Sequence, residues 1–184
     1  MIALGALWLL LWQGRARVAA LVFVCVGFLL WTQADRPDVL ISDTGGLVGV
    51  MTSEGRALSK AKGQGFVVDN WLENDGSLRD QAGAASLWPG EISRVPFVDL
   101  AHGGRLIHVQ GKTGKALFDG CAPQDTVVFS TVFEGQLPCE TLDVKDLEEL
   151  GSVALRFEGA SSLRKTAREV AGRRLWNDAE VRGQ

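Results

Sequence analysis

The sequence predicts an α+β protein in which a transmembrane helical hairpin precedes a single layered domain. Two observations lead to this class. The first is the strongly apolar segment 1–34, which contains no acidic residue. The second is the segment 35–184, in which short β-branched runs alternate with a few stretches of helical spacing. This mixture is typical of α+β or αββα layered domains, and 150 residues are enough for one core.

The apolar N-terminal segment consists of two runs separated by a short basic stretch. Residues Ile2–Trp12 and Val18–Trp31 are almost entirely apolar, and Arg15 and Arg17 lie between them. A helix needs about 20 apolar residues to cross the hydrocarbon of a bilayer, so the second run is long enough only when its flanks are counted. The pattern favours a hairpin at the end of a larger transmembrane bundle.

Two other interpretations of this segment stay open. The first alternative is one long, interrupted anchor. The second is a secretory signal, although a signal carries its positive charge before the apolar core. In the favoured hairpin, Arg15 and Arg17 determine the topology, because short arginine-bearing loops stay in the cytoplasm. The segment 35–184 would then lie outside the cytoplasm, on a protein of the inner membrane.

The stretch Arg36–Asp75 organises the second segment. Two apolar runs, Val39–Ile41 and Leu47–Met51, flank a Gly-containing turn and predict a β-hairpin. Ala57 and Leu58 predict a third, short strand. Apolar residues then recur at helical spacing from Phe66 to Leu72 and predict an amphipathic helix.

The remainder of the chain predicts further strands and two more helices. We expect a loop over residues 74–90 and a helix over Asp143–Leu150, and we favour a short helix over Ser161–Val170. The expected strands are Ile92–Leu100, Arg105–Val109, Lys115–Phe118, Thr126–Phe129 and Ser152–Phe157.

The charge balance excludes one class of function. The whole chain has a formal charge of −3, and the segment 35–184, with 17 basic and 22 acidic residues, carries −5. A domain that grips nucleic acid over a broad basic face has the opposite sign.

Candidate chemical motifs are few. His102 and His108 are the only histidines and lack the spacing of a zinc site. Gly111–Lys115 departs from the phosphate-loop pattern, and a hairpin turn is expected there instead. Cys121 and Cys139 flank a predicted strand, and outside the cytoplasm they form a possible disulfide. No catalytic, cofactor-binding or metal-ligating residue is predicted, and no cofactor.

Several stretches taken together resemble the C-terminal region of ComEC-type competence proteins. These stretches are RPDVLISDTGGLVGVMTSEGRALSK, FVVDNWLENDG, CAPQDTVVFST, GSVALRF and GRRLW. Proteins of that family carry single-stranded DNA through the membrane during transformation. The resemblance implies a metallo-β-lactamase-like αββα domain over 35–184, with other transmembrane helices of the same or a split protein as partners.

Departures from the family pattern imply a degenerate domain. The region Gly63–Asp75, where nuclease-type members carry a His-x-His-x-Asp-His cluster, contains no histidine, and Ser130–Val132 stands where they have a His pair. The resemblance therefore implies a non-catalytic outer domain for DNA uptake. A small membrane-anchored envelope binding module of unrelated function and a metal-dependent hydrolase or nuclease are the two alternatives.

Overall fold

The chain forms two compact units, and each is described by itself. In the computed structural model the first unit is Met1–Arg36 and the second is Pro37–Gln184, so the division falls two residues beyond the predicted boundary. The described residues are 2–12, 14, 17–32, 36–100, 103–158 and 161–172.

The N-terminal unit consists of helices α1, Ile2–Leu11, and α2, Arg17–Thr32. The two helices approach closely because Gly5 has no side chain: a Cβ there would lie 2.8 Å from Val24 Cγ2. Trp8 of α1 also stacks on Phe23 of α2, with ring centroids 6.4 Å apart. Most of the large apolar side chains of both helices are nevertheless exposed.

The predicted transmembrane hairpin is wrong. Among the described residues, no helix combines the length and the apolar character needed to cross a membrane. With 10 and 16 residues, α1 and α2 rise about 15 and 24 Å, against a hydrocarbon thickness of about 30 Å. The inner-membrane location that depends on this hairpin is wrong for the same reason. Arg17 begins α2, and Arg15 lies outside the described residues.

The first sheet of the second unit has five antiparallel strands in the order β3-β2-β1-β8-β9. The predicted hairpin is confirmed, with Val39 opposite Val50 and Ile41 opposite Val48. The strands are β1 Val39–Ile41, β2 Val48–Thr52, β3 Gly55–Leu58, β8 Val153–Glu158 and β9 Ser161–Thr166.

The second sheet has four strands in the order β4-β5-β6-β7, with an antiparallel β4–β5 pair followed by parallel pairs. All four residues of β6 are buried, as its β-branched sequence predicts. The strands are β4 Phe97–Asp99, β5 Arg105–Val109, β6 Thr126–Phe129 and β7 Glu140–Leu142.

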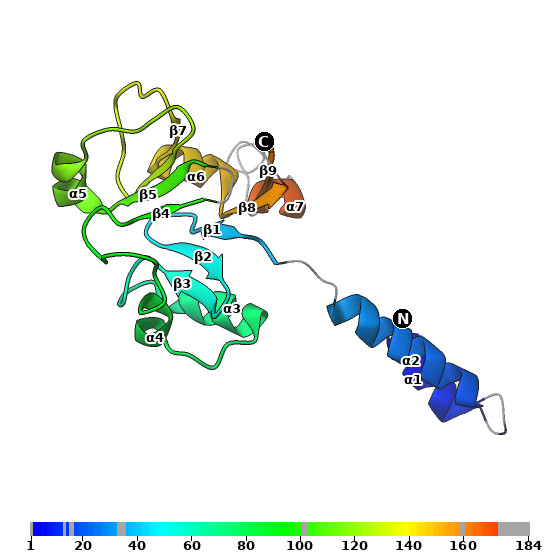
Figure 1. Cartoon of the computed structure of the whole chain (residues 1–184). Helices are drawn as coiled ribbons and strands as arrows, with labels where there is room; N and C mark the ends of the chain where they lie inside the picture. Colours follow the sequence, from blue (N-terminus) through cyan, green and yellow to red (C-terminus); the bar gives the residue numbers. More distant parts are fainter. Residues whose placement is uncertain are drawn as a thin grey trace. The chain divides into compact units, whose positions relative to one another are not determined.

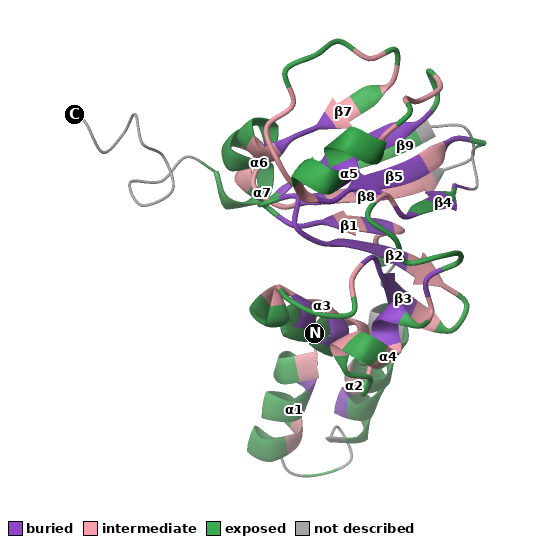
Figure 2. Ribbon diagram, turned by 90° about the vertical axis from the view of Figure 1, so that its left-hand side faces the viewer, coloured by how far each residue is buried: buried purple, intermediate pink, exposed green. Residues whose placement is uncertain are grey.

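The two sheets share one apolar core. Val39 and Ile41 of the first sheet contribute to the same buried cluster as Leu106 and Val128 of the second. Figure 1 shows the two sheets as successive layers, and Figure 2 shows that their strands carry most of the buried residues. The α+β class is therefore present.

The predicted αββα layering, however, is wrong. Helices α3, Gly65–Asp75, and α4, Gln81–Ala85, cover the outer face of the first sheet. The outer face of the second sheet is covered by loop residues, among them Phe118, Phe133 and the two cysteines of a disulfide. Helix α5, Gly111–Leu117, buries only Gly114 because its sequence lacks an apolar face.

The expected loop over residues 74–90 contains the short helix α4, which Asp80 caps. Three other local predictions fail for identifiable reasons. Gly111 adopts φ +66 and begins α5, where a hairpin turn was expected, so the expected strand 115–118 does not form. The residues 161–166 pair with β8 as an edge strand, and only α7, Ala167–Ala171, is helical. Thr166, the last residue of β9, is the N-cap of α7 and forms a capping box with Glu169. This cap fixes the change from strand to helix.

The predicted acidic helix is confirmed as α6, Val144–Leu150. Asp143 caps its first turn by accepting hydrogen bonds from the backbone N–H groups of Lys145 and Asp146. Leu147 is fully buried in the shared core, so this cap also fixes how the helix meets the sheets.

Candidate functional site

A buried polar joint connects the two sheets, and it consists of His108, Ser59 and Gly45. His108 lies on β5, Ser59 follows β3, and Gly45 lies in the turn between β1 and β2. The His108 Nδ1 atom is 2.8 Å from Ser59 Oγ, and its Nε2 atom is 2.9 Å from the Gly45 carbonyl oxygen. His108 and Ser59 are completely inaccessible to solvent.

The partners of the joint determine its protonation. A carbonyl oxygen only accepts, so Nε2 of His108 carries the proton and donates it to Gly45. Nδ1 is then the acceptor of the Ser59 hydroxyl, whose oxygen accepts in turn from the Val48 N–H at 3.0 Å. Burial lowers the pKa of His108 to about 3, so the ring is neutral at ordinary pH.

Gly45 is required at its position for two reasons. Its φ of +60 lies in the left-handed region, and a Cβ there would lie 2.5 Å from the carbonyl oxygen of Phe129. This tight approach brings the β1–β2 turn against the second sheet and presents the Gly45 carbonyl to His108.

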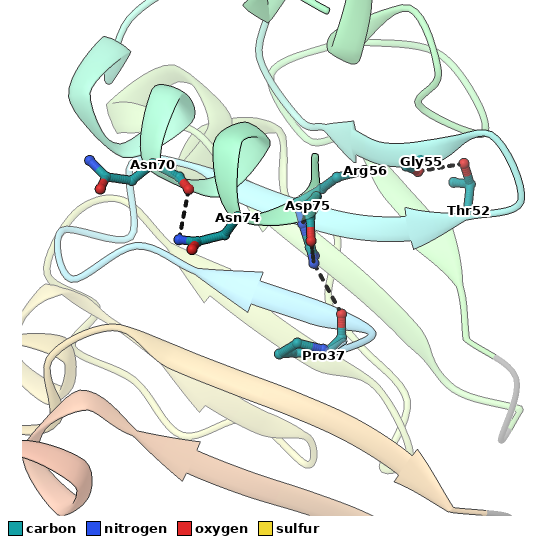
Figure 3. A network of polar contacts seen from close by, with 7 residues as sticks. All are labelled: Pro37, Thr52, Gly55, Arg56, Asn70, Asn74 and Asp75. Atoms are coloured by element: carbon teal, nitrogen blue, oxygen red, sulfur yellow. Dashed lines mark hydrogen bonds and ion pairs between the residues drawn. The ribbon is translucent and has the colours of Figure 1, made fainter. Parts of the chain in front are cut away.

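A buried ion pair fastens the other end of the first sheet. Arg56 of β3 donates through Nε and Nη2 to the carboxylate of Asp75, the last residue of α3, and through Nη2 to the Pro37 carbonyl at 3.2 Å (Figure 3). The side chains of Arg56 and Asp75 are only 1% and 9% exposed. Gly49 leaves room for the arginine stem, since a Cβ there would lie 3.0 Å from Arg56 Cδ.

A pocket lined by basic side chains opens next to the histidine joint. Its volume is about 480 Å³. Three of its residues carry positive charge, and no described carboxylate forms an ion pair with any of them. The lining residues are Lys60, Ala61, Lys62, Ile92, Ser93, Arg94 and Gln110. We refer to this set as the cationic pocket.

Gln110 holds the two walls of the cationic pocket together. It follows β5 and is buried, and its backbone N–H donates to the Arg94 carbonyl at 2.9 Å. Its side-chain Nε2 donates to the Ser59 carbonyl at 3.1 Å. Because Ser59 directly precedes Lys60, Gln110 fixes the backbone on both sides of the pocket.

A second glutamine fixes the lysine-bearing loop. Gln81, the first residue of α4, donates from Nε2 to the carbonyl oxygens of Lys60 and Gly63, at 3.2 and 2.6 Å. The loop that carries Lys60 and Lys62 is therefore held at both ends, whereas the charged ends of the side chains make no ion pair within the described chain.

The pKa values of Lys60 and His108 reflect the positive charge gathered at the cationic pocket. Partial burial, and then the positive charge of Arg94, lower the pKa of Lys60 below its usual 10.5. Lys60 also contributes to the lowered pKa of His108. The pocket is thus a local region of positive potential in a segment with a formal charge of −5, from 17 basic and 22 acidic residues.

The structure places the predicted site residues as follows. Cys121 and Cys139 form a disulfide with a Cα–Cα distance of 6.0 Å, as the sequence suggested. His102 lies outside the described residues. In the described part of the chain, no group of three His, Cys, Asp or Glu side chains is placed to hold a metal ion.

The comparisons with known proteins add no relative. No protein-family model matches the chain, and no curated protein or solved structure is significantly similar to it. The resemblance to ComEC-type proteins therefore stays a prediction, and the function has to be argued from the geometry.

The cationic pocket is the feature that the sequence analysis missed. Lys60 and Lys62 stand in the run SKAKGQG, between a strand and a helix, where closely spaced lysines next to glycines are a recognisable local signal. Arg94 and Gln110 come from segments distant in sequence. The antiparallel pair of β4 and β5 brings these two residues together, and the Gln110–Ser59 hydrogen bond connects them to the lysine-bearing loop.

Proposed function

We propose that this protein is a binding protein, and that the cationic pocket holds a phosphate group of single-stranded DNA. One observation carries the proposal. Lys60, Lys62 and Arg94 line the same pocket, and within the described residues no carboxylate forms an ion pair with them. By contrast, the arginines at positions 56, 79, 105 and 164 each form an ion pair with a carboxylate.

The chemistry of these side chains suits phosphate oxygens. The planar guanidinium of Arg94 can donate two parallel hydrogen bonds, while each lysine ammonium acts as a point charge with three donors. Like charges that share a pocket repel one another, and a bound anion removes that repulsion. Phosphate should therefore bind more tightly in this pocket than at an isolated surface lysine.

Single-stranded DNA is the ligand that the resemblance to ComEC-type proteins suggests. The segment charge of −5, from 17 basic and 22 acidic residues, opposes binding over the rest of the surface. Contact is accordingly restricted to the cationic pocket, and the affinity of this chain alone is modest.

Burial of the Ser59–His108 pair supports binding without catalysis. A serine hydroxyl that donates to a histidine is the arrangement of an activated nucleophile. Here both side chains are fully buried, and the Ser59 oxygen also accepts from a backbone N–H. No substrate reaches this hydroxyl in the folded protein, so the pair serves as a connection between sheets.

Fluorescence anisotropy of the full chain with a labelled single-stranded oligonucleotide tests the proposal. One phosphate group neutralised in the pocket predicts that the logarithm of the affinity falls with the logarithm of the salt concentration with a slope of about −0.7. The double substitution Lys62→Ala with Arg94→Ala should weaken binding at least tenfold and flatten this slope further.

The matched control is Lys145→Ala with Lys165→Ala. It removes the same number of positive charges, two, from exposed positions on α6 and β9. This control should change the affinity about twofold at most, through the general field of the protein. Equal losses in both double variants, or no binding by the wild type, would contradict the proposal.

A further inference from the structure

We infer that the cationic pocket recognises a terminal phosphate monoester, such as the 5′-phosphate of a strand end, in preference to a phosphodiester within the strand. This inference rests on the proposed function and names the chemical group that the pocket selects. It follows from how the positive charge is distributed, from the number of donors, and from the neutral groups beside them.

The positive charge is concentrated at one place. Proteins that follow a single strand use a long basic groove with aromatic side chains on which successive bases stack. The pocket provides three cations in about 480 Å³, and none of its lining residues is aromatic. Such an arrangement fits one compact, highly charged group better than a length of backbone.

The number of donors matches a monoester. A phosphate monoester carries a charge of about −1.5 to −2 near neutral pH and presents three acceptor oxygens, whereas a diester carries one negative charge. Lys60, Lys62 and Arg94 together offer one cation for each oxygen of a monoester. With a diester, two of the three positive charges would stay uncompensated.

Two neutral residues complete the pocket. The Ser93 oxygen accepts a hydrogen bond from the Val95 N–H at 3.1 Å, which leaves the hydroxyl proton available for a phosphate oxygen. Ile92 is 43% exposed at the same pocket and offers an apolar surface to the organic part of the monoester. The buried Gln110 keeps these walls at a fixed separation.

The test compares two oligonucleotides of identical sequence that differ only in a 5′-phosphate or a 5′-hydroxyl, each titrated with the full chain. One additional charge-assisted interaction predicts that the phosphorylated strand binds about tenfold tighter or more. Deoxyadenosine monophosphate should displace the phosphorylated strand, whereas deoxyadenosine should not. If the free nucleotide binds as tightly as the strand end, the pocket recognises the monoester alone.

Two double variants distinguish a failure of this inference from a failure of the proposed function. Lys62→Ala with Arg94→Ala should bring the ratio of the two affinities close to one, and Lys145→Ala with Lys165→Ala should leave it unchanged. Equal binding of both oligonucleotides, with both weakened by the pocket variant, would overturn the inference and leave the proposed function standing. Binding that the pocket variant does not weaken, or no binding, would overturn both.

Discussion

The histidine joint and the cationic pocket are adjacent in the chain but differ in how their polar groups are satisfied. Ser59 belongs to the joint and Lys60 to the pocket. Both ring nitrogens of His108 have a partner inside the protein, whereas the lysines and the arginine of the pocket form no ion pair with a described carboxylate. The histidine joint therefore stabilises the fold, whereas the charged side chains of the cationic pocket are available to a ligand.

The same contrast extends to the arginines. Arg56 is buried against Asp75 and a backbone carbonyl, so its charge contributes to the attachment of α3. Arg94 is exposed at the pocket, with its backbone, and not its guanidinium, held by Gln110. Charge alone therefore does not distinguish structural from exposed cations in this protein, whereas the buried carboxylate and carbonyl partners of Arg56 do.

The largest expected effect is the loss of the buried ion pair. Asp75→Asn keeps the shape of the side chain but leaves the Arg56 charge without its counterion, so the free energy of unfolding should fall by about 3–5 kcal/mol. Urea denaturation followed by circular dichroism measures this change. The control is Glu54→Gln in the exposed pair with Arg79, which should cost at most about 1 kcal/mol. Similar losses in the two variants would show that burial does not distinguish the pairs.

The second effect is acid sensitivity caused by the histidine joint. The pKa of His108 is about 3 in the folded chain and about 6.5 when unfolded, so between these values the unfolded state binds more protons. Stability should therefore fall by about 1.4 kcal/mol per pH unit as the pH drops below 6.5. The slope between pH 6.5 and 4.5 is diagnostic, because ordinary carboxyl groups titrate below this range.

His108→Gln is the variant that isolates this effect. The glutamine amide does not titrate, so unfolding free energies of the variant should lose the acid slope even if the variant is less stable at neutral pH. Parallel pH profiles for the wild type and the variant would contradict a buried, neutral His108.

How far the sequence predicted the structure depends on the range of the interactions involved. The β1–β2 hairpin, β6 and α6 follow from local signals, namely a Gly turn, a β-branched run and an Asp cap. The edge strand β9 was missed because its polar sequence is a strand only through pairing with β8. Local apolar content likewise predicted a membrane hairpin, but it does not determine how long a helix continues.

The site was harder to predict than the fold, for the same reason. His108 was identified as a strand residue, but its partners Ser59 and Gly45 are 49 and 63 positions away in sequence. The cationic pocket joins three separate segments, and its one local signal, the pair Lys60 and Lys62, stands in a segment whose total charge is negative. An overall charge does not reveal that three cations without a described carboxylate partner line one pocket.

The third prediction concerns substitutions in the cationic pocket. They should change the stability of the protein little and its binding of the oligonucleotide strongly. Lys62→Ala with Arg94→Ala should change the free energy of unfolding by no more than about 0.5 kcal/mol per substitution, because both side chains are exposed and lack ion pairs with described carboxylates. Saturating oligonucleotide should raise the melting temperature of the wild type, since a ligand that binds only the folded state stabilises it. The variant should show no such increase. If the variant were clearly less stable than the wild type, Lys62 and Arg94 would be side chains that support the fold.

The smallest expected effect is a change in the alkaline limit of binding. Because burial and Arg94 lower the pKa of Lys60, its charge is lost at a lower pH than that of an ordinary lysine, and affinity for the oligonucleotide should begin to fall before pH 10.5. Lys60→Arg keeps a charge over this whole range, so its affinity should match the wild type at pH 7 within about threefold and then decline less at high pH. Anisotropy titrations from pH 7 to 10 measure both. If the two proteins decline together, Lys60 does not contact the ligand, and the remaining cations, Lys62 and Arg94, account for the binding.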